Sequence, residues 1–424
     1  MAQLTDDCFA FSGPLMPLEE MERLIAERIT PVAETEMVAL AAARGRVLAA
    51  DLVAPVDLPP FDNSAVDGYA VRHADLNANG DTTLKIAGRL QAGQGAANQV
   101  GKGEAIRIFT GAPMPAGADT VFMQEDVQAK DDAVTVPSGL KSGANRRLAG
   151  EDLRKGAVAL AAGTVLDAPQ IALAAALGVT DLKVRRRLRV AIFSTGNEVI
   201  EPGGARSAAA IFDANRYLLA QLLGHRQALV TDLGILPDDP DKLMRAIGDA
   251  AARHDLIITS GGVSTGEADY VRNAVEKIGR LVFWRIGIKP GRPVAMAKLP
   301  GPNPGEGAAF VGLPGNPVAV FVTFVRVVRP LLLRLAGALP QPLVPLPVRV
   351  GFAYKKKTGR REYVRVSLKR RDDGELEAIK HPQDGAGVII SLTQTDGLLE
   401  FADDVTAVAP GDRAGFLSYA VLMG

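Results

Sequence analysis

The sequence has few side chains that form disulfides or bind transition metals. Cys8 is the only cysteine among 424 residues, which excludes a disulfide within the chain and a zinc cluster built on cysteines. The four histidines lack the short spacing of metal ligands, so we expect surface or packing roles for His73, His225, His254 and His381.

A charge imbalance is also absent. Lysine and arginine together number 48, as do aspartate and glutamate, so the formal net charge is zero. Proteins that bind nucleic acid usually show a basic excess. We therefore expect no nucleic-acid partner, and any anion binding must be local.

Long apolar runs are missing as well. The most apolar stretch, residues 317–337, is interrupted by Arg326, Arg329 and Arg334, so it predicts a buried helix and not a membrane span. The N-terminus has acids and lacks the apolar segment of a signal peptide. We expect a cytoplasmic protein without a membrane partner.

Four common catalytic signatures are also absent: a Walker A loop, GxGxxG with a following acid, HExxH and GxSxG. The sequence therefore gives no support for a simple ATPase, dehydrogenase, metalloprotease or esterase function.

The chain changes character along its length. Residues 17–29 have the periodicity of an amphipathic helix, and residues 53–148 alternate short apolar runs with Gly, Pro, Asn and Asp, which indicates a small β-rich domain. Residues 169–178 predict a short helix. The last ~85 residues follow a Pro-rich link and again read as a β domain.

Between these parts, strand and helix patterns alternate. Apolar runs predict strands at 188–196, 227–236, 254–262, 281–288 and 308–315, with helices at 213–223, 239–254 and 267–279. Asp239 and Pro240 suit the cap and first residue of a helix. This alternation predicts a doubly wound, mostly parallel α/β sheet, whose ligands bind beyond the carboxyl ends of the strands.

The stretch SGGVSTGEADY, residues 260–270, lies at such a strand end. Gly261 and Gly262 permit a sharp turn, and free N–H groups at the following helix start attract phosphate. Either Glu267 or Asp269 is then placed to hold Mg²⁺ against that phosphate. The alternative is that these acids only cap the helix dipole, worth ~0.3–1 kcal/mol each.

Other predicted strand ends carry polar groups too. Glu198 and Asp238 follow two strands, and Lys289 and Arg292 follow another within a proline-stiffened loop. Helix capping alone also explains Asn316 and Pro317 in the stretch LPGNP. The basic run at 355–365 predicts a solvated face.

Taken in order, several stretches resemble the molybdopterin molybdenumtransferases, the MoeA-type proteins, which are similar to the E domain of gephyrin. The resemblance covers the chain from about residue 14 to its end. It rests on PPFDNSAVDGYAV, RIFTGAPMPAGADTVFMQED, NRRLAGED, IFSTGNE, FDANRYLL, GILPDDP, SGGVSTGEADY, FWRIGIKPGRP and GLPGNPVA.

The resemblance implies the final step of molybdenum cofactor synthesis. Such enzymes take adenylylated molybdopterin and molybdate, use Mg²⁺, and release AMP. Their elongated homodimers place the site across the interface, and a molybdopterin adenylyltransferase is a possible donor of the substrate.

The implied architecture is a multidomain α/β protein. A central doubly wound, mostly parallel α/β domain of molybdopterin-binding type is joined by two smaller β-rich domains and a small mixed linking domain. The expected ranges are 1–30 for a helix packed on the α/β domain, 31–52 plus 149–181 for the linking domain, 53–148 for the β-rich domain, 182–336 for the α/β domain and 337–424 for the C-terminal β domain.

The resemblance also assigns residues by motif. The implied catalytic residues are Asp67, Thr110, Glu198, Asp238 and Asp269, of which Glu198, Asp238 and Asp269 would hold the metal. The implied substrate-binding residues are Ser260, Gly261, Gly262, Ser264, Lys289, Arg292, Pro314, Pro317 and Arg365. Asn197, Arg285 and Ala386 depart from the usual Asp, Lys and Ser, and Ser391 is a candidate substitute for the last.

Two other functions stay open at this point. A pterin-binding adenylyltransferase uses the same kind of sheet, although the two flanking β domains favour the transferase. A non-catalytic, gephyrin-like scaffold is the second alternative, against which the retained carboxylates argue.

Overall fold

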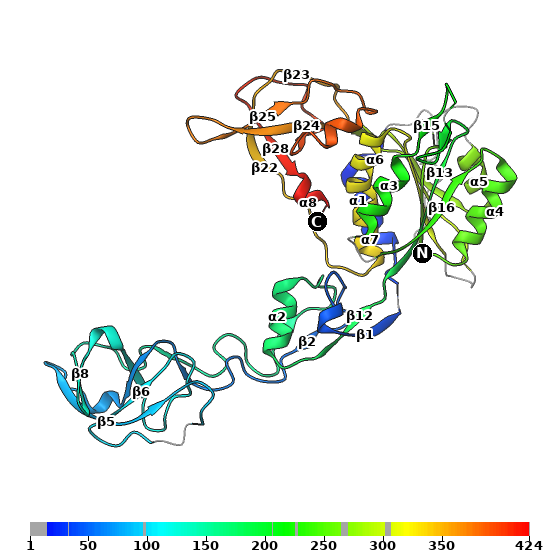
Figure 1. Cartoon of the computed structure of the whole chain (residues 1–424). Coiled ribbons are helices and arrows are strands. Elements are labelled where there is room, and N and C mark those ends of the chain that lie inside the picture. Colours follow the sequence, from blue (N-terminus) through cyan, green and yellow to red (C-terminus); the bar gives the residue numbers. More distant parts are fainter. Residues whose placement is uncertain are drawn as a thin grey trace.

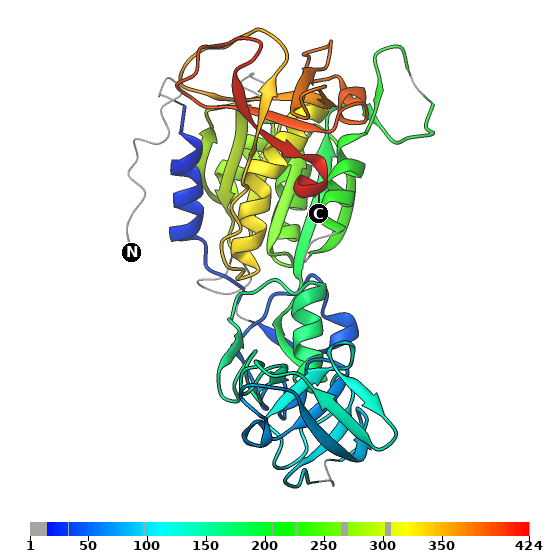
Figure 2. The same cartoon turned by 90° about the vertical axis from the view of Figure 1, so that its left-hand side faces the viewer.

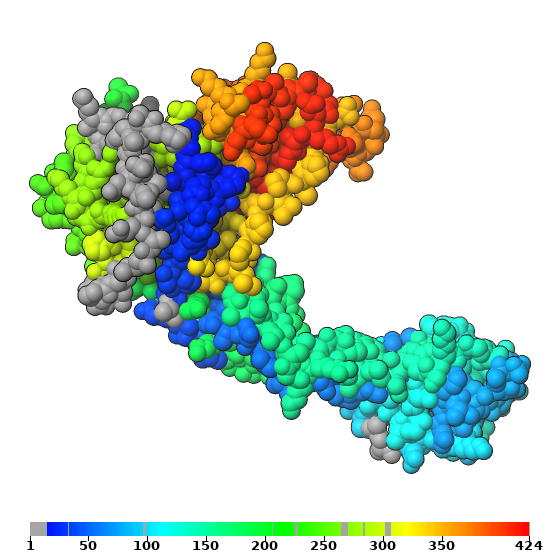
Figure 3. Space-filling view, turned by 180° about the vertical axis from the view of Figure 1, so that it is seen from behind, coloured from blue at the N-terminus to red at the C-terminus, as the bar shows by residue number. Residues whose placement is uncertain are grey.

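The structure, a computed structural model, describes residues 15–32, 34–95, 99–205, 207–224, 228–263, 270–301 and 307–423. The molecule is elongated. The α/β domain and the C-terminal β domain form a body at one end, and a β-rich domain lies at the tip of an arm at the other (Figure 1; Figure 2; Figure 3). No helix within the described ranges is both long and apolar enough to cross a membrane.

The α/β domain is built on a six-stranded sheet. Its order is β16 (Ala228–Leu236), β13 (Leu188–Thr195), β17 (Leu256–Ser260), β21 (Ala309–Leu313), β20 (Pro293–Lys298) and β18 (Arg280–Arg285). The first four strands are parallel, and β20 runs antiparallel to both neighbours. The prediction of a mostly parallel sheet is therefore confirmed, although β20 is not among the strands that the apolar runs predict.

Helices cover both faces of this sheet, as the doubly wound prediction requires. One face packs against α1 (Leu18–Arg28), α3 (Asn215–Gly224), α6 (Pro317–Thr323) and α7 (Arg329–Leu335), the last two joined by a π-helical turn at Phe324–Val328. The other face packs against α4 (Pro240–Ala251) and α5 (Tyr270–Ile278). Alternate residues of each strand supply the two cores, because side chains alternate across a strand.

The predicted caps are partly confirmed. Asp239 caps α4 by accepting from the backbone N–H groups of Asp241 and Lys242 at 3.0 Å each, and Pro240 is the first helical residue. Asn316 precedes α6, but its side chain makes no capping hydrogen bond.

The arm consists of a linking part and a sheet at its tip. The linking part pairs β1 (Thr35–Ala39) with β12 (Asp181–Arg185) and β2 (Leu52–Val53) with β11 (Val158–Leu160), beside α2 (Ala168–Ala176). The tip sheet has the order β7 (Thr120–Met123), β4 (Gly68–Val71), β6 (Glu104–Ile108), β5 (Thr82–Leu90), β9 (Ala133–Val136) and β8 (Gln128–Lys130), with β3 (Asn63–Ser64) and β10 (Arg146–Arg147) paired nearby. Short 3₁₀ turns occupy Leu40–Ala42, His73–Asp75 and Gln124–Asp126.

The C-terminal domain is a closed barrel. Its strands are β24 (Arg361–Arg370), β25 (Leu376–Lys380), β22 (Leu346–Val350), β28 (Arg413–Ser418) and β26 (Gly397–Phe401), and the second pairing of β24, with β26, closes the ring. A further pair, β23 (Tyr354–Lys355) and β27 (Ala407–Val408), a 3₁₀ turn at Ile389–Leu392, and α8 (Tyr419–Met423) complete it. In the α/β domain β14 (Val199–Ile200) pairs with β15 (Ile211–Phe212).

One strand joins the barrel to the α/β domain. The loop after β18 forms β19 (Ile288–Lys289), which pairs in parallel with the start of β24. The predicted solvated face at 355–365 is only partly correct. Lys355 and residues 357–359 are exposed, but this pairing and the barrel core bury the second part of the run. Glu362, Tyr363 and Arg365 are only 1%, 2% and 5% exposed.

Candidate active site

The carboxyl ends of the parallel strands bring polar residues to one edge of the sheet. Thr195 ends β13 opposite Leu236 of β16, and Ser260 ends β17 opposite Leu313 of β21. Because parallel strands all end at the same edge, the loops that follow them converge there.

The end of β13 and the loop that follows it bind the side chain of Asp238, which itself follows β16. The Thr195 hydroxyl donates to the Asp238 carboxylate at 2.6 Å, and the backbone N–H of Asn197 donates to its other oxygen at 3.1 Å. Gly196 has a φ of +137°, and a Cβ built on it would lie 2.7 Å from a carboxylate oxygen of Glu198. The chain therefore places the carboxylates of Glu198 and Asp238 around the same short loop.

Close packing explains the two glycines that follow Ser260. Gly261 has a φ of +92°, and a Cβ on it would lie 2.7 Å from the carbonyl oxygen of Thr195. Gly262 also has a positive φ, and its Cβ would collide with Val271. The turn after β17 thus lies directly against the turn after β13. Ser264, Glu267 and Asp269 lie outside the described residues.

Asn215 joins two of these strand ends, and it is not among the residues that the sequence predicts. Its side-chain N–H donates to the Ser260 hydroxyl at 2.9 Å and to the Gly315 carbonyl at 2.7 Å, while Ser260 donates to the carbonyl of Pro314 at 3.1 Å. The Asn215 carbonyl oxygen is buried without a partner in the part of the chain that is described. In the sequence, an asparagine near the start of a predicted helix looks like an ordinary N-cap, so the sequence alone does not distinguish Asn215 as a site residue.

A buried arginine holds Asn215 in place. Arg216 is 5% exposed and forms ion pairs with Asp213 (3.0 Å), Glu201 and Asp232. Burial alone would lower the pKa of Arg216, but these carboxylates raise it above its ordinary value. The start of α3 is therefore held by charge pairs that join three segments of the chain.

The C-terminal barrel presents Arg365 to this edge of the sheet. Arg365 donates to the Ser391 hydroxyl at 3.0 Å and to the carbonyls of Gln383 and Gly385 at 3.0 and 3.1 Å. The next residue, Ala386, accepts through its carbonyl from the backbone N–H of Val318, in the first turn of α6, at 3.0 Å. The loop that Arg365 binds thus contacts the first turn of α6, where Pro317 lies, and Ser391 does contact Arg365.

Lys289 is bound to the barrel. Its ammonium lies 3.1 Å from the carboxylate of Glu362, which also accepts from Tyr354 and Arg360 at 2.7 Å each. Burial would raise the pKa of Glu362, but these donors hold it below its ordinary value. Arg292 is exposed, three residues further along the loop.

Asp67 and Thr110 lie elsewhere. One oxygen of Asp67 accepts from both the backbone N–H and the hydroxyl of Thr110, each at 2.8 Å, and the backbone bond is the main reason that the pKa of Asp67 is lowered. Both residues belong to the tip domain, whose β6 lies at the far end of the arm from β13 (Figure 1). One chain therefore does not bring them to the other predicted site residues.

The donor set at the sheet edge suits the Mg²⁺ that the resemblance implies. Mg²⁺ binds through one or two carboxylates, with waters and substrate phosphates completing its shell. Asp238 and Glu198 supply two carboxylates from adjacent loops. Among the described residues there is no cluster of three or more His, Cys, Asp or Glu that would form a complete metal site.

Comparison with known families accounts for nearly the whole chain. Residues 16–178 match "MoeA N-terminal region (domain I and II)", residues 191–334 match "Probable molybdopterin binding domain", and residues 347–418 match "MoeA C-terminal region (domain IV)". The fold and the sheet-edge site thus define a multidomain protein built around a molybdopterin-binding type of domain.

Similar proteins agree with these matches. The chain is 35% identical to a molybdopterin molybdenumtransferase of Haemophilus influenzae, over 97% of this chain and 100% of that one. It is 38% identical to one of a Nostoc species, over 89% and 87% of the two chains. The crystal structure of a molybdopterin biosynthesis MoeA protein from Pyrococcus horikoshii superposes with a TM-score of 0.77 at 29% identity, covering 96% of this chain and all of that one.

The chain belongs to the MoeA-type family of molybdopterin molybdenumtransferases. It is therefore an enzyme, a transferase with a role in molybdenum cofactor biosynthesis.

Proposed function

We propose that this enzyme inserts molybdenum from molybdate into adenylylated molybdopterin, with Mg²⁺-dependent release of AMP. The observation that carries the proposal is the junction between the barrel and α6. There the Ala386 carbonyl binds Val318, so that the buried guanidinium of Arg365 stands beside a sheet edge lined with carboxylates and glycines. A tetrahedral oxyanion and a phosphoanhydride are substrates that such an arrangement can hold together.

We assign the metal ligands to Asp238, Glu198 and Asp269. Bound there, Mg²⁺ would neutralise the charge of the phosphoanhydride as it is cleaved. Asp238 is oriented by Thr195 and Asn197, so its carboxylate needs little rearrangement to bind. Gly261, Gly262 and Ser264 would cradle the phosphates, since backbone N–H groups at a glycine turn bind oxyanions.

We assign the pterin to Ser260, Pro314 and Pro317, with Asn215 as an added contact. The Asn215 carbonyl oxygen has no partner within the described residues, so it can accept from a ring N–H.

Molybdate is assigned to Arg365, Lys289 and Arg292. An ammonium has three donors, so Lys289 can keep its bond to Glu362 while it binds the dianion.

We propose that a second copy of the chain completes the site. Asp67 and Thr110 are hydrogen-bonded to each other at the tip of the arm. Within one chain they lie far from the other predicted site residues. In a homodimer in which the tip of each arm meets the sheet edge of the other subunit, Asp67 and Thr110 would join the predicted site residues at that sheet edge. Delivery of the substrate by a molybdopterin adenylyltransferase, and a cytoplasmic location, stay predictions.

The test is AMP release from adenylylated molybdopterin by the purified protein with Mg²⁺, with and without molybdate. We expect release that depends on both ions. Tight binding of the adenylylated pterin without AMP release would refute the catalytic proposal and favour a binding role.

A further inference from the structure

A pocket lies at the edge of the α/β sheet opposite to the candidate active site. It has a volume of about 660 Å³ and lies between the end of α1 with the chain that follows, the amino ends of β13, β17 and β21, and the end of β20. β17 separates the two edges by five residues, Leu256–Ser260, which corresponds to ~16 Å of extended strand. The pocket therefore shares no described wall with the candidate active site.

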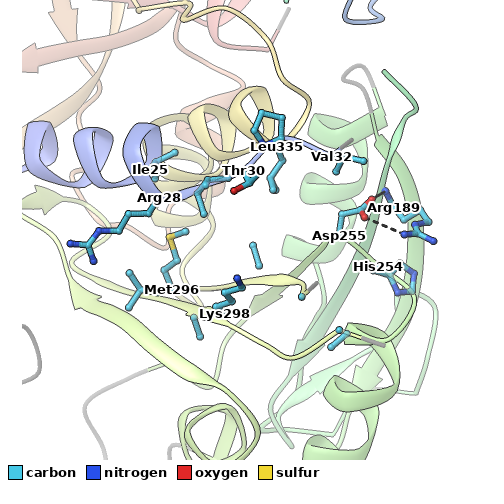
Figure 4. A pocket seen from close by; sticks show the side chains of 18 of the residues that line it. Ile25, Arg28, Thr30, Val32, Arg189, His254, Asp255, Met296, Lys298 and Leu335 are labelled. Carbon is cyan, nitrogen blue, oxygen red and sulfur yellow. Dashed lines mark hydrogen bonds and ion pairs between the residues drawn. The ribbon is translucent and has the colours of Figure 1, made fainter. Parts of the chain in front are cut away.

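The pocket has an apolar side. Ile25, Met296, Ala309 and Leu335, which line it, are at most 8% exposed. In Figure 4, Ile25, Val32 and Leu335 lie along one side, and Met296 lies across from them. An apolar body of a ligand would be removed from water there, and volumes of this size are those of small-molecule sites.

The pocket also has an excess of positive charge. Among the described lining residues are five lysines and arginines but two carboxylates: Arg28, Arg186, Arg189, Arg280 and Lys298, against Glu34 and Asp255. A chain whose net charge is zero has gathered cations at this place.

The two carboxylates are already paired. Asp255 is 10% exposed and accepts from both terminal nitrogens of Arg186, at 2.6 and 2.8 Å, and from the backbone N–H of Arg189 at 2.7 Å. Arg186 also pairs with Glu34. Asp255 and Glu34 are therefore paired with Arg186 and Arg189, and these two acids do not neutralise Arg28 or Lys298.

Lys298 takes no part in these pairs, and neither does Arg28. Lys298 is an exposed residue at the end of β20, and its ammonium has no ion pair or hydrogen bond with any residue in the described ranges. It lies across the pocket from Leu335 and Thr30 (Figure 4). On a third side, the Nδ1 of His254 bonds to the carbonyl of Ala250 at 2.9 Å, which leaves its Nε2 for another partner.

We propose that this pocket binds a small amphiphilic anion, one phosphate, sulfonate or carboxylate group on an apolar body. The anionic group pairs with Lys298, and the apolar body packs on Met296, Ile25 and Leu335. Neither the family matches nor the proposed reaction assigns a ligand to this edge of the sheet.

The experiment measures binding of 1-anilinonaphthalene-8-sulfonate to the full-length protein by its fluorescence. Lys298→Glu reverses the charge at the pocket, and we expect it to weaken the saturable binding about tenfold, because an attraction becomes a repulsion. Lys183→Glu is the matched control: Lys183 is also an exposed strand residue but does not line the pocket. It should leave the dissociation constant within about twofold.

Two further arms test the apolar half. Thr30 is exposed and lines the pocket, so Thr30→Trp should fill the pocket without disturbing the fold and should abolish the saturable binding. Octyl phosphate should displace the probe, and inorganic phosphate at the same concentration should not. Unchanged affinity in both Lys298→Glu and Thr30→Trp, or equal displacement by inorganic phosphate, would overturn the proposal.

Discussion

Replacing Glu362 by glutamine should loosen the C-terminal barrel. The Glu362 side chain is 1% exposed and accepts from Lys289, Tyr354 and Arg360. Glutamine keeps the shape but removes the charge, so two cations lose their counter-ion. Removing one partner of a fully buried pair costs roughly 3–5 kcal/mol. Lys289 is 49% exposed, so water screens its share, and we expect about 2–3 kcal/mol.

Amide hydrogen exchange of β24 and β25 measures this loss in the intact protein. A loss of 2–3 kcal/mol in the opening free energy makes exchange about 30- to 150-fold faster. Glu375→Gln is the control, because Glu375 lies in the same domain but is 38% exposed in its pair with Arg413, and it should change exchange little. Equal exchange rates for Glu362→Gln and Glu375→Gln would refute the reasoning.

For the same variant we expect the loss of stability to depend on pH. The pKa of Glu362 lies below its ordinary value of 4.5 in the folded protein. A lowered pKa stabilises the fold above the unfolded-state pKa, and the contribution disappears as the pH falls through the folded-state value. The difference in unfolding free energy between wild type and Glu362→Gln should therefore be constant above about pH 5 and shrink steadily below about pH 4.5. A difference that grows on acidification would contradict this sign.

Three other outcomes are expected. Asp238→Asn should lower Mg²⁺-dependent AMP release at least about a hundredfold while thermal unfolding stays unchanged; a change of less than about threefold would remove Asp238 from the site. Equal amounts of Asp67→Asn and Asp238→Asn chains, unfolded and refolded together, should regain about a quarter of wild-type activity, since half of the random dimers contain one intact site; no recovery would argue against a shared site. Gly262→Ala should lower the unfolding free energy by about 1–3 kcal/mol because of its positive φ and the collision with Val271. Gly315→Ala, where a Cβ meets nothing within 4 Å, should stay within about 0.5 kcal/mol, and similar losses for both variants would show that the packing argument fails.

Local patterns determined much of the fold. The apolar runs at 188–196 and 254–262 became β13 and β17, since a continuous apolar run of that length between turn residues suits a strand buried on both faces. Asp239 and Pro240 began α4 as predicted, because capping involves only backbone groups two or three residues away. The glycines after Ser260 were also visible, since a turn with positive φ demands them.

Predictions made from one segment failed where a distant segment decides the environment. The charged run at 355–365 looks solvated by composition, but β19 from the α/β domain pairs with it and buries Glu362. β20 begins with Pro293 and follows another proline and a glycine, and its position between β21 and β18 gives it strand partners.

By itself, then, the sequence determined strands such as β13 and β17, the Asp239 cap, the glycine turns and the family, because these depend on neighbouring residues or on motifs in order. The tertiary structure alone decided that Asn215 joins Ser260 to Gly315, that Lys289 is paired with Glu362, and that Asp67 lies far from Asp238 in one chain. The physical reason is the same in each case. Burial and pairing of a polar side chain depend on which segments the packing of sheets brings together, and residues more than forty positions apart carry no local pattern that records it.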